Sequence, residues 1–244
     1  MSWEIVAGLA VTLVALYLLN DWISRHLQGI GLLATGREGG AIALAWLIFL
    51  PGIVLHELSH WLVARVLGLR PSRLRVWPER RGRSVRMGYV DFRSGGALRD
   101  SLVGLAPFIT GCALLLWIAT RVFDIEGLDG WREAALALWA GRGYPDAWLY
   151  IYLIFAISNG MMPSSSDREA WGTLLLYILL AIGGLYALDL LPALSPRHIA
   201  LIFQGVQMLT YALGLAVLVD LPMAGVIGLI EWMLERLTGR SVVY

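Results

Sequence analysis

Six long stretches of the chain contain no charged residue, and this feature restricts its possible folds more than any other. They cover residues 5–20, 39–56, 101–120, 147–166, 170–188 and 198–219. A helix needs about 20 mostly apolar residues to cross the hydrocarbon core of a bilayer. Over the whole chain only 15% of residues are charged, compared with roughly a quarter in soluble domains. The pattern excludes a soluble domain and predicts an all-α polytopic membrane protein, with about six transmembrane helices in a single domain covering residues 1–244.

The two ends of the chain need separate interpretation. Residues 1–20 lack the basic start and the small-residue cleavage site of a signal peptide, so we expect a retained first span. Residues 223–237 carry three charged side chains on an otherwise apolar pattern. This pattern is typical of an amphipathic helix at the membrane interface, and a seventh span is the alternative.

The distribution of arginine predicts the orientation in the membrane. All 19 basic residues are Arg, and ten of them lie in residues 65–99. Short basic loops stay in the cytoplasm, so six spans would place both termini there, in a prokaryotic inner or plasma membrane. The net charge of +1 creates no field that would attract nucleic acid. The expected partners therefore include the lipid bilayer and exclude nucleic acid.

The same basic segment has a strand-like pattern. Apolar and polar residues alternate over 73–77 and 85–89, and a turn-like sequence at 78–83 separates them. A period of two on both sides of a turn indicates a β-hairpin. We therefore expect a small membrane-associated hairpin over residues 72–93 on the cytoplasmic side; a solvated basic loop that contacts anionic lipid is the alternative.

The second span, which we expect to continue to about Leu67, contains His56, Glu57 and His60. Residues four apart lie on one face of a helix, so both imidazoles can reach one metal ion, with Glu57 beside them as a general base. This is the HExxH pattern of zinc peptidases. Ionisable groups inside a span are costly and are functional candidates by default. A His pair that hydrogen-bonds inside the bundle without metal is the alternative.

A tetrahedral catalytic zinc site takes three ligands from the protein. Asp167 follows the fourth charge-free stretch on the predicted cytoplasmic side, at a depth similar to that of His56 and His60. Glu169 and Asp189 are the alternatives for the third ligand. Two imidazoles and a carboxylate suit zinc, so Zn²⁺ is the expected cofactor.

Asn159 lies inside the fourth stretch, before Pro163 and Asp167. A proline there breaks the helix and frees backbone groups, which a membrane protein tolerates where the segment lines a wet cavity. Asn159 can donate to a carbonyl oxygen of a substrate, so it is a candidate catalytic residue. Hydrogen bonding between helices is the alternative role for its side chain.

With these motifs the chain resembles the site-2 protease family of intramembrane zinc metalloproteases. The resemblance rests on the HExxH motif from His56 to His60 and on the later stretch with Asn159, Pro163 and Asp167. In the family, an Asn and a Pro precede a Leu-Asp-Gly sequence whose Asp is the third zinc ligand. In this chain a Ser and an Arg flank the Asp instead.

The resemblance covers roughly residues 41–171 and implies a core of three helices, in a minimal member without a PDZ or CBS domain. It implies hydrolysis of peptide bonds in or near transmembrane segments of membrane-protein substrates, with the hairpin pairing with substrate. The implied metal ligands are His56, His60 and Asp167, and the implied catalytic residues are Glu57 and Asn159. Two other functions remain open: a membrane zinc peptidase with a Glu as third ligand, and a non-catalytic membrane protein with a structural His pair.

Overall fold

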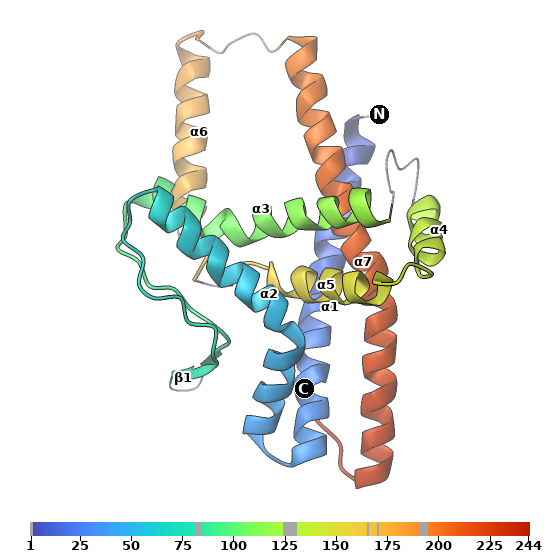
Figure 1. Ribbon diagram of the computed structural model, residues 1–244. Helices are drawn as coiled ribbons and strands as arrows, with labels where there is room; N and C mark the ends of the chain where they lie inside the picture. The colour runs from blue at the N-terminus through green and yellow to red at the C-terminus, as the bar shows by residue number, and fades with distance from the viewer. Residues whose placement is uncertain (1, 82–83, 124–130, 165, 170, 191–194) are drawn as a thin grey trace.

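The computed structural model describes residues 2–81, 84–123, 131–164, 166–169, 171–190 and 195–244 (Figure 1). Its helices are α1 (Ser2–Thr35), α2 (Glu38–Val66), α3 (Ala97–Val122), α4 (Trp131–Gly141), α5 (Ala147–Gly160), α6 (Trp171–Ala187) and α7 (Pro196–Thr238). Two short strands, β1 (Glu79–Arg81) and β2 (Ser84–Arg86), lie between α2 and α3 in the sequence.

The centre of the bundle is the pair α1 and α7, which pack along each other. Helix α2 packs against α1, α3 and α5, and Figure 1 shows α3 and α5 lying across the α1–α7 pair. One apolar core joins these helices, because each of them contributes side chains that other helices cover. Its most deeply buried members include Leu16, Ile23, Leu115, Ile154, Phe155 and Leu213.

Among the residues that the structure describes, four helices are long and apolar enough to cross a membrane. They are the segments Val6–Thr35, Glu38–Val66, Ala97–Val122 and Pro196–Thr238. Helices α5 and α6 are also apolar but have only 14 and 17 residues, fewer than the roughly 20 that a crossing helix needs. The predicted all-α membrane architecture is thus confirmed, whereas the number of six spans stays a prediction.

The first helix is longer than predicted. The charge-free stretch predicted a span that ends near Asn20, but α1 continues to Thr35. Arg25 forms an ion pair with Asp21 one turn before it, and His26 contacts an acidic side chain of α7. Because these charged and polar side chains have partners, the helix continues past Asp21, the first charged residue after the apolar stretch.

The C-terminal helix that was predicted at the membrane interface is not a separate element. Helix α7 is continuous from Pro196 to Thr238 and contains Pro222. Residues 223–237 are helical, as predicted, but they continue α7, and Glu231, one of the charges on which the prediction rested, is buried against α1. Their location at a membrane interface stays a prediction. Glu231 in this segment therefore makes a contact between two helices, α7 and α1.

Strands β1 and β2 pair antiparallel, and a separate, isolated antiparallel bridge joins Arg75 and Tyr89. The ladder is shorter than the alternation over residues 72–93 suggested. Residues 79–81, which were expected in the turn, form β1, and residues 82–83 lie outside the described part of the chain. Association of this segment with a membrane surface stays a prediction.

Helix α2 bends along its length (Figure 1). It contains Pro51, which removes a backbone hydrogen bond and bends helices. The next residue, Gly52, lies against α5, where a Cβ atom would overlap the carbonyl group of Ala156 and approach Gly160. Small residues let membrane helices approach closely, so the following turn of α2, with His56, reaches the C-terminal end of α5.

Candidate metal centre

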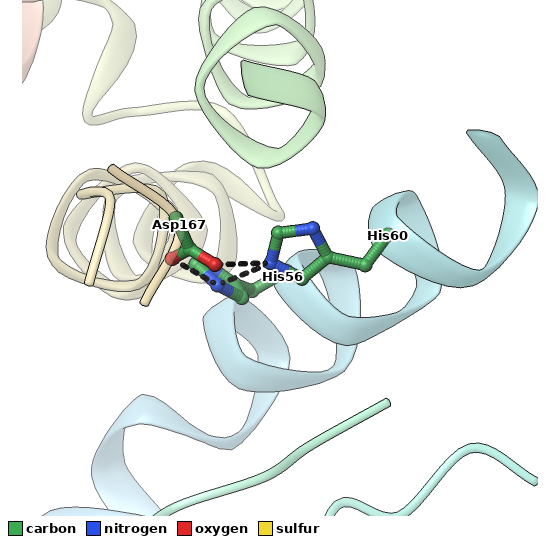
Figure 2. Close-up of side chains that lie close together, drawn as sticks. All are labelled: His56, His60 and Asp167. Carbon is green, nitrogen blue, oxygen red and sulfur yellow. Dashed lines mark hydrogen bonds and ion pairs between the residues drawn. The ribbon is translucent and has the colours of Figure 1, made fainter. Parts of the chain in front are cut away.

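His56 and His60 lie one turn apart on α2 and face the same side. Their ring centroids are 4.6 Å apart, in an edge-to-face arrangement. Their side chains are largely buried, with 12% and 9% of their surfaces exposed. Figure 2 shows that both imidazoles turn toward Asp167, which comes from a different part of the chain.

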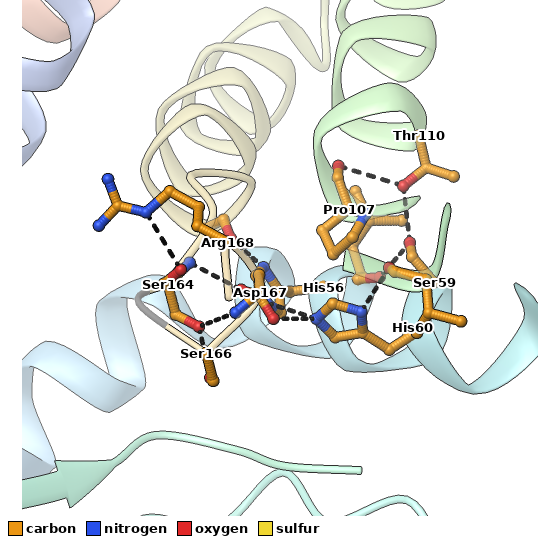
Figure 3. A network of polar contacts seen from close by, with 12 residues as sticks. His56, Ser59, His60, Pro107, Thr110, Ser164, Ser166, Asp167 and Arg168 are labelled. Atoms are coloured by element: carbon orange, nitrogen blue, oxygen red, sulfur yellow. Dashed lines mark hydrogen bonds and ion pairs between the residues drawn. The ribbon is translucent and has the colours of Figure 1, made fainter. Parts of the chain in front are cut away.

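Asp167 reaches this point from the turn that follows α5. The helix ends at Gly160, and Pro163 comes soon afterwards and disfavours its continuation. The Ser164 N–H donates to Asp167 Oδ2 at 2.6 Å, and the Asp167 N–H donates to Ser164 Oγ at 3.3 Å. Figure 3 shows this closed turn beside α2; it orients the carboxylate toward the two histidines.

Helix α3 leaves room for the turn at one glycine. A Cβ atom on Gly104 would overlap the carbonyl oxygen of Asp167. The overlap is with backbone, which cannot rotate away as a flexible side chain can. The lack of a side chain at Gly104 therefore sets how closely the Asp167 backbone approaches α3.

Potential ligand atoms of three residues converge between these elements. His60 Nε2 lies 3.0 Å from His56 Nε2 and 3.1 Å from Asp167 Oδ1, and His56 Nε2 lies 3.4 Å from Asp167 Oδ2. Zinc–ligand bonds of about 2.0–2.1 Å at tetrahedral angles place ligand atoms about 3.4 Å apart. The three residues can therefore hold a metal ion with little rearrangement.

The remaining ring nitrogens are fixed by backbone carbonyl groups. His56 Nδ1 donates to the Gly160 carbonyl oxygen and His60 Nδ1 donates to the Val103 carbonyl oxygen, both at 2.8 Å. Because a carbonyl oxygen only accepts, the lone pair of each neutral imidazole lies on Nε2. Histidines that bind metals are typically held in this way. Two such lone pairs repel each other unless a proton or a metal ion lies between them.

The charge of Asp167 fits the same arrangement. Burial alone would raise the pKa of its carboxyl group, but its interactions with His56 and His60 hold that pKa well below its usual range. The carboxylate is therefore ionised beside the two rings. A proton or a metal ion at the Nε2 atoms is the positive charge that balances it.

Glu57 is buried next to this group but is not one of the three converging residues. Only 7% of its surface is exposed. Its side chain lies against Gly88, where a Cβ atom would come within 2.8 Å of Glu57 Cγ. The segment after β2 therefore packs on Glu57, and this contact also depends on a glycine.

A cavity of about 860 Å³ borders the three converging residues and Glu57, which is within the usual range of roughly 300–1,000 Å³ for ligand-binding clefts. The segment 85–92 forms one wall. Other walls come from α1 and α2 and include Ser24, Gln28, Ala45, Phe49 and Ile53. The cavity thus offers apolar surface together with a few polar groups beside the candidate ligands.

Asn159 borders the cavity, but its amide group is engaged inside the bundle. Its Nδ2 donates to the Phe155 carbonyl oxygen at 2.9 Å, and its Oδ1 accepts from Asn20 Nδ2 at 3.2 Å. The interhelical hydrogen bond that we considered as an alternative role is therefore present. A contact between Asn159 and a substrate stays a prediction.

The other candidates for a third ligand lie elsewhere. Glu169 borders the cavity but is exposed, and Asp189 is exposed after the end of α6. Within the described residues, His56, His60 and Asp167 form the one group of three whose potential ligand atoms all lie within 4.8 Å of one another. The structure thus brings together the three residues that the sequence suggested as ligands.

Sequence reasoning missed a polar network on the far side of Asn159. Asp220 of α7 is completely buried and accepts hydrogen bonds from Ser158 of α5. Asp220 directly follows the last charge-free stretch, so its position was visible in the sequence. Its partner was not visible, because that contact depends on how α5 packs against α7.

Comparisons of the chain with protein-family models, with curated proteins and with solved structures give no match. The geometry of the site is therefore the basis from which its function has to be inferred.

Proposed function

We propose that the protein is an intramembrane zinc metalloprotease that hydrolyses peptide bonds in or near transmembrane segments of membrane proteins. The observation that carries this proposal is the convergence of His56, His60 and Asp167 within a bundle of long apolar helices. Ionisable groups inside membrane helices are costly and usually serve a function.

Zinc fits the donor set. Imidazole nitrogen and carboxylate oxygen are donors that zinc commonly takes, and the carbonyl groups of Gly160 and Val103 leave both Nε2 atoms available. His56, His60 and Asp167 would hold the ion. Zinc bound there would lower the pKa of a water molecule and polarise the scissile carbonyl group.

Glu57 supplies the proton transfer in this proposal. Its carboxylate borders the same cavity as the ligands and is not one of them, so it can accept a proton from the attacking water and pass it to the leaving amine. Asn159 borders the cavity as well. If its amide releases the Phe155 carbonyl oxygen, it can donate to the carbonyl oxygen of the substrate.

A helical transmembrane substrate has to unwind locally before cleavage, because its backbone N–H and C=O groups are engaged in hydrogen bonds within the helix. The segment 85–92 lines the cavity, and its backbone could hold an unwound peptide by strand addition.

We place this segment and both termini on the cytoplasmic side of a prokaryotic inner membrane, because ten Arg residues lie in 65–99 and basic loops stay inside. Helices α5 and α6 would then be the two additional spans.

The two alternatives account for fewer of these features. A peptidase with a glutamate as third ligand would have to use Glu169, which is exposed and outside the converging group. A purely structural His pair gives no reason for a buried Glu57 beside a cavity. We therefore favour Asp167 as the third ligand and Glu57 as the catalytic base.

Metal analysis of the purified full chain tests the ligand set. We expect one zinc ion per chain in the wild type and in Glu169→Ala, and loss of zinc in His56→Ala and Asp167→Ala. The exposed Glu169 is the matched control, because it borders the cavity without joining the converging group. Zinc loss in Glu169→Ala together with retention in Asp167→Ala would move the proposal to the glutamate-type peptidase.

Cleavage of a transmembrane peptide tests the chemistry. Removal of a general base typically costs about 10²- to 10⁴-fold in rate, so Glu57→Gln should cleave at about 1% of the wild-type rate or less while it keeps its zinc. Equal cleavage by the wild type and Glu57→Gln, or a wild type that binds no zinc, would refute the proposal.

A further inference from the structure

Asp220 is a buried acidic residue to which the proposed chemistry assigns no role. It lies within α7 and has no exposed surface. Its Oδ1 and Oδ2 atoms accept from Ser158 Oγ of α5 at 2.9 Å and 3.1 Å, and Ser158 Oγ in turn accepts from Asn159 Nδ2 at 3.3 Å. Burying a carboxyl group is costly unless hydrogen bonds compensate, so this contact ties α7 firmly to the last turn of α5.

Helix α1 holds the same turn from another side. Asn20 Nδ2 donates to the backbone carbonyl oxygen of Asn159 at 2.9 Å and to its Oδ1 atom at 3.2 Å. Asn20 therefore fixes both the backbone and the side chain of one residue. Two helices outside the ligand-bearing segments thus hold the last turn of α5.

That turn continues directly into the metal centre. The next residue, Gly160, has the carbonyl group that accepts the hydrogen bond from His56 Nδ1 at 2.8 Å. Gly160 also lies against the backbone of Gly52 on α2, closely enough that a Cβ atom would overlap it. The position of the α5 end therefore determines where the His56 ring points.

We propose that Asp220 and Asn20 are positioning residues for the metal centre. They hold the last turn of α5 so that the Gly160 carbonyl group keeps His56 Nε2 directed at the point where His60 and Asp167 meet. This inference rests on the proposed metal-binding function and adds to it a dependence on α1 and α7. Loss of a partner that orients a metal ligand typically lowers metal affinity about 10- to 100-fold. Asp220 acts one step further away, so we expect the lower end of that range.

The test measures zinc affinity of the purified full chain by competition with a chelator, and the d–d spectrum of the Co²⁺-loaded chain. Asp220→Ala and Ser158→Ala should each weaken zinc binding about tenfold and change the Co²⁺ spectrum. The double variant should be no weaker than either single variant, because both changes break the same contact. Asp220→Asn keeps an acceptor oxygen for Ser158 and should restore most of the affinity.

Asn20→Ala tests the other contact. It should also weaken zinc binding about tenfold, and the double variant with Ser158→Ala should bind zinc more weakly than either single variant, because the two changes release α5 from different helices. Full affinity in Asn20→Ala would remove Asn20 from the proposal.

Glu231→Gln is the matched control. Glu231 is another buried acidic residue of α7, but its partners are His26 and Tyr244, so its replacement should leave zinc affinity and the Co²⁺ spectrum unchanged. Ser158→Ala removes a single hydroxyl group and serves as the folded variant if Asp220→Ala does not fold, as judged by gel filtration in detergent.

The outcomes distinguish a failure of the proposed zinc binding from a failure of the positioning role. A wild-type chain without zinc affinity overturns the proposed function and this inference together. A wild type that binds zinc, combined with unchanged affinity in Ser158→Ala and Asp220→Ala, overturns the positioning role alone. An equal loss in Glu231→Gln would also overturn it, because the effect would then be a general loosening of α7.

Discussion

In the described part of the chain, histidine meets a carboxylate in two clusters of the helical bundle. In the first, His56 and His60 of α2 face Asp167 beside the cavity. In the second, His26 of α1 contacts Glu231 of α7. Both clusters are largely buried, so burial and residue type do not distinguish them. The clusters differ in which imidazole nitrogen and carboxylate oxygen atoms remain available to bind a metal ion.

In the second cluster both carboxylate oxygens of Glu231 already have a partner. Glu231 Oε2 contacts His26 Nδ1, and Glu231 Oε1 accepts from the Tyr244 hydroxyl group. Burial and the Glu231 carboxylate raise the pKa of the Tyr244 hydroxyl group, so it stays a donor. In the first cluster, backbone carbonyl groups occupy the Nδ1 atoms instead and leave Nε2 of His56 and His60 directed at Asp167. A histidine and an acid in a membrane bundle thus indicate a metal site only where free lone pairs converge.

The largest expected difference between the clusters is in metal binding. His60→Ala removes one of three ligands and should lower zinc affinity by at least about 100-fold, whereas His26→Ala should leave it unchanged. Chelator competition on the two purified variants measures both values. Equal zinc loss in both variants would show that the two clusters do not differ in the way proposed here.

The second largest effect is expected at the close contact between Gly104 and the Asp167 backbone in the first cluster. Gly104→Ala places a methyl group where the Asp167 backbone now lies and should lower zinc affinity about 10-fold or more, comparable to the loss of an orienting contact. Gly205→Ala on α7 is the matched control, since a Cβ atom there meets nothing within 4 Å. Zinc titration of both variants decides the point, and full affinity in Gly104→Ala would contradict it.

A smaller effect is expected at the contact between Gly88 and Glu57. Gly88→Ala adds a methyl group 2.8 Å from Glu57 Cγ and 3.1 Å from the Arg75 carbonyl oxygen. The glutamate side chain can shift by part of this overlap, so we expect cleavage of a transmembrane peptide to fall about 5- to 10-fold, well short of the loss of a general base. Zinc content should not change. A parallel loss of zinc would place the effect at the ligands instead.

The smallest effect concerns the second cluster alone. Tyr244→Phe removes the hydroxyl group that donates to Glu231, and a single hydrogen bond typically contributes about 0.5–1.5 kcal/mol to stability. Thermal unfolding in detergent should therefore show a slightly lower midpoint with unchanged zinc affinity and cleavage. A variant that loses zinc would show that the two clusters are coupled through α7.

The sequence predicted well the features that depend on neighbours along the chain. The spacing of His56 and His60 places them on one face wherever the helix packs, and the charge-free stretches located the long helices. The end of the first span was misplaced, because Arg25 pairs with Asp21 within the same helix and His26 finds a partner on α7 that the local sequence does not reveal. The helix predicted over 223–237 is present but is the end of α7, and the sequence did not reveal that Glu231 pairs across the bundle.

The helical membrane character and the shared face of His56 and His60 follow from composition and from the helical period, so they could be predicted from the chain alone. The meeting with Asp167, the fixing of the two rings by the carbonyl groups of Val103 and Gly160, and the contact of Asp220 with the end of α5 depend on how the helices pack. These contacts join residues far apart in the chain. They depend on the close approach of α2, α3 and α5 at glycines whose effect appears only once the helices are packed.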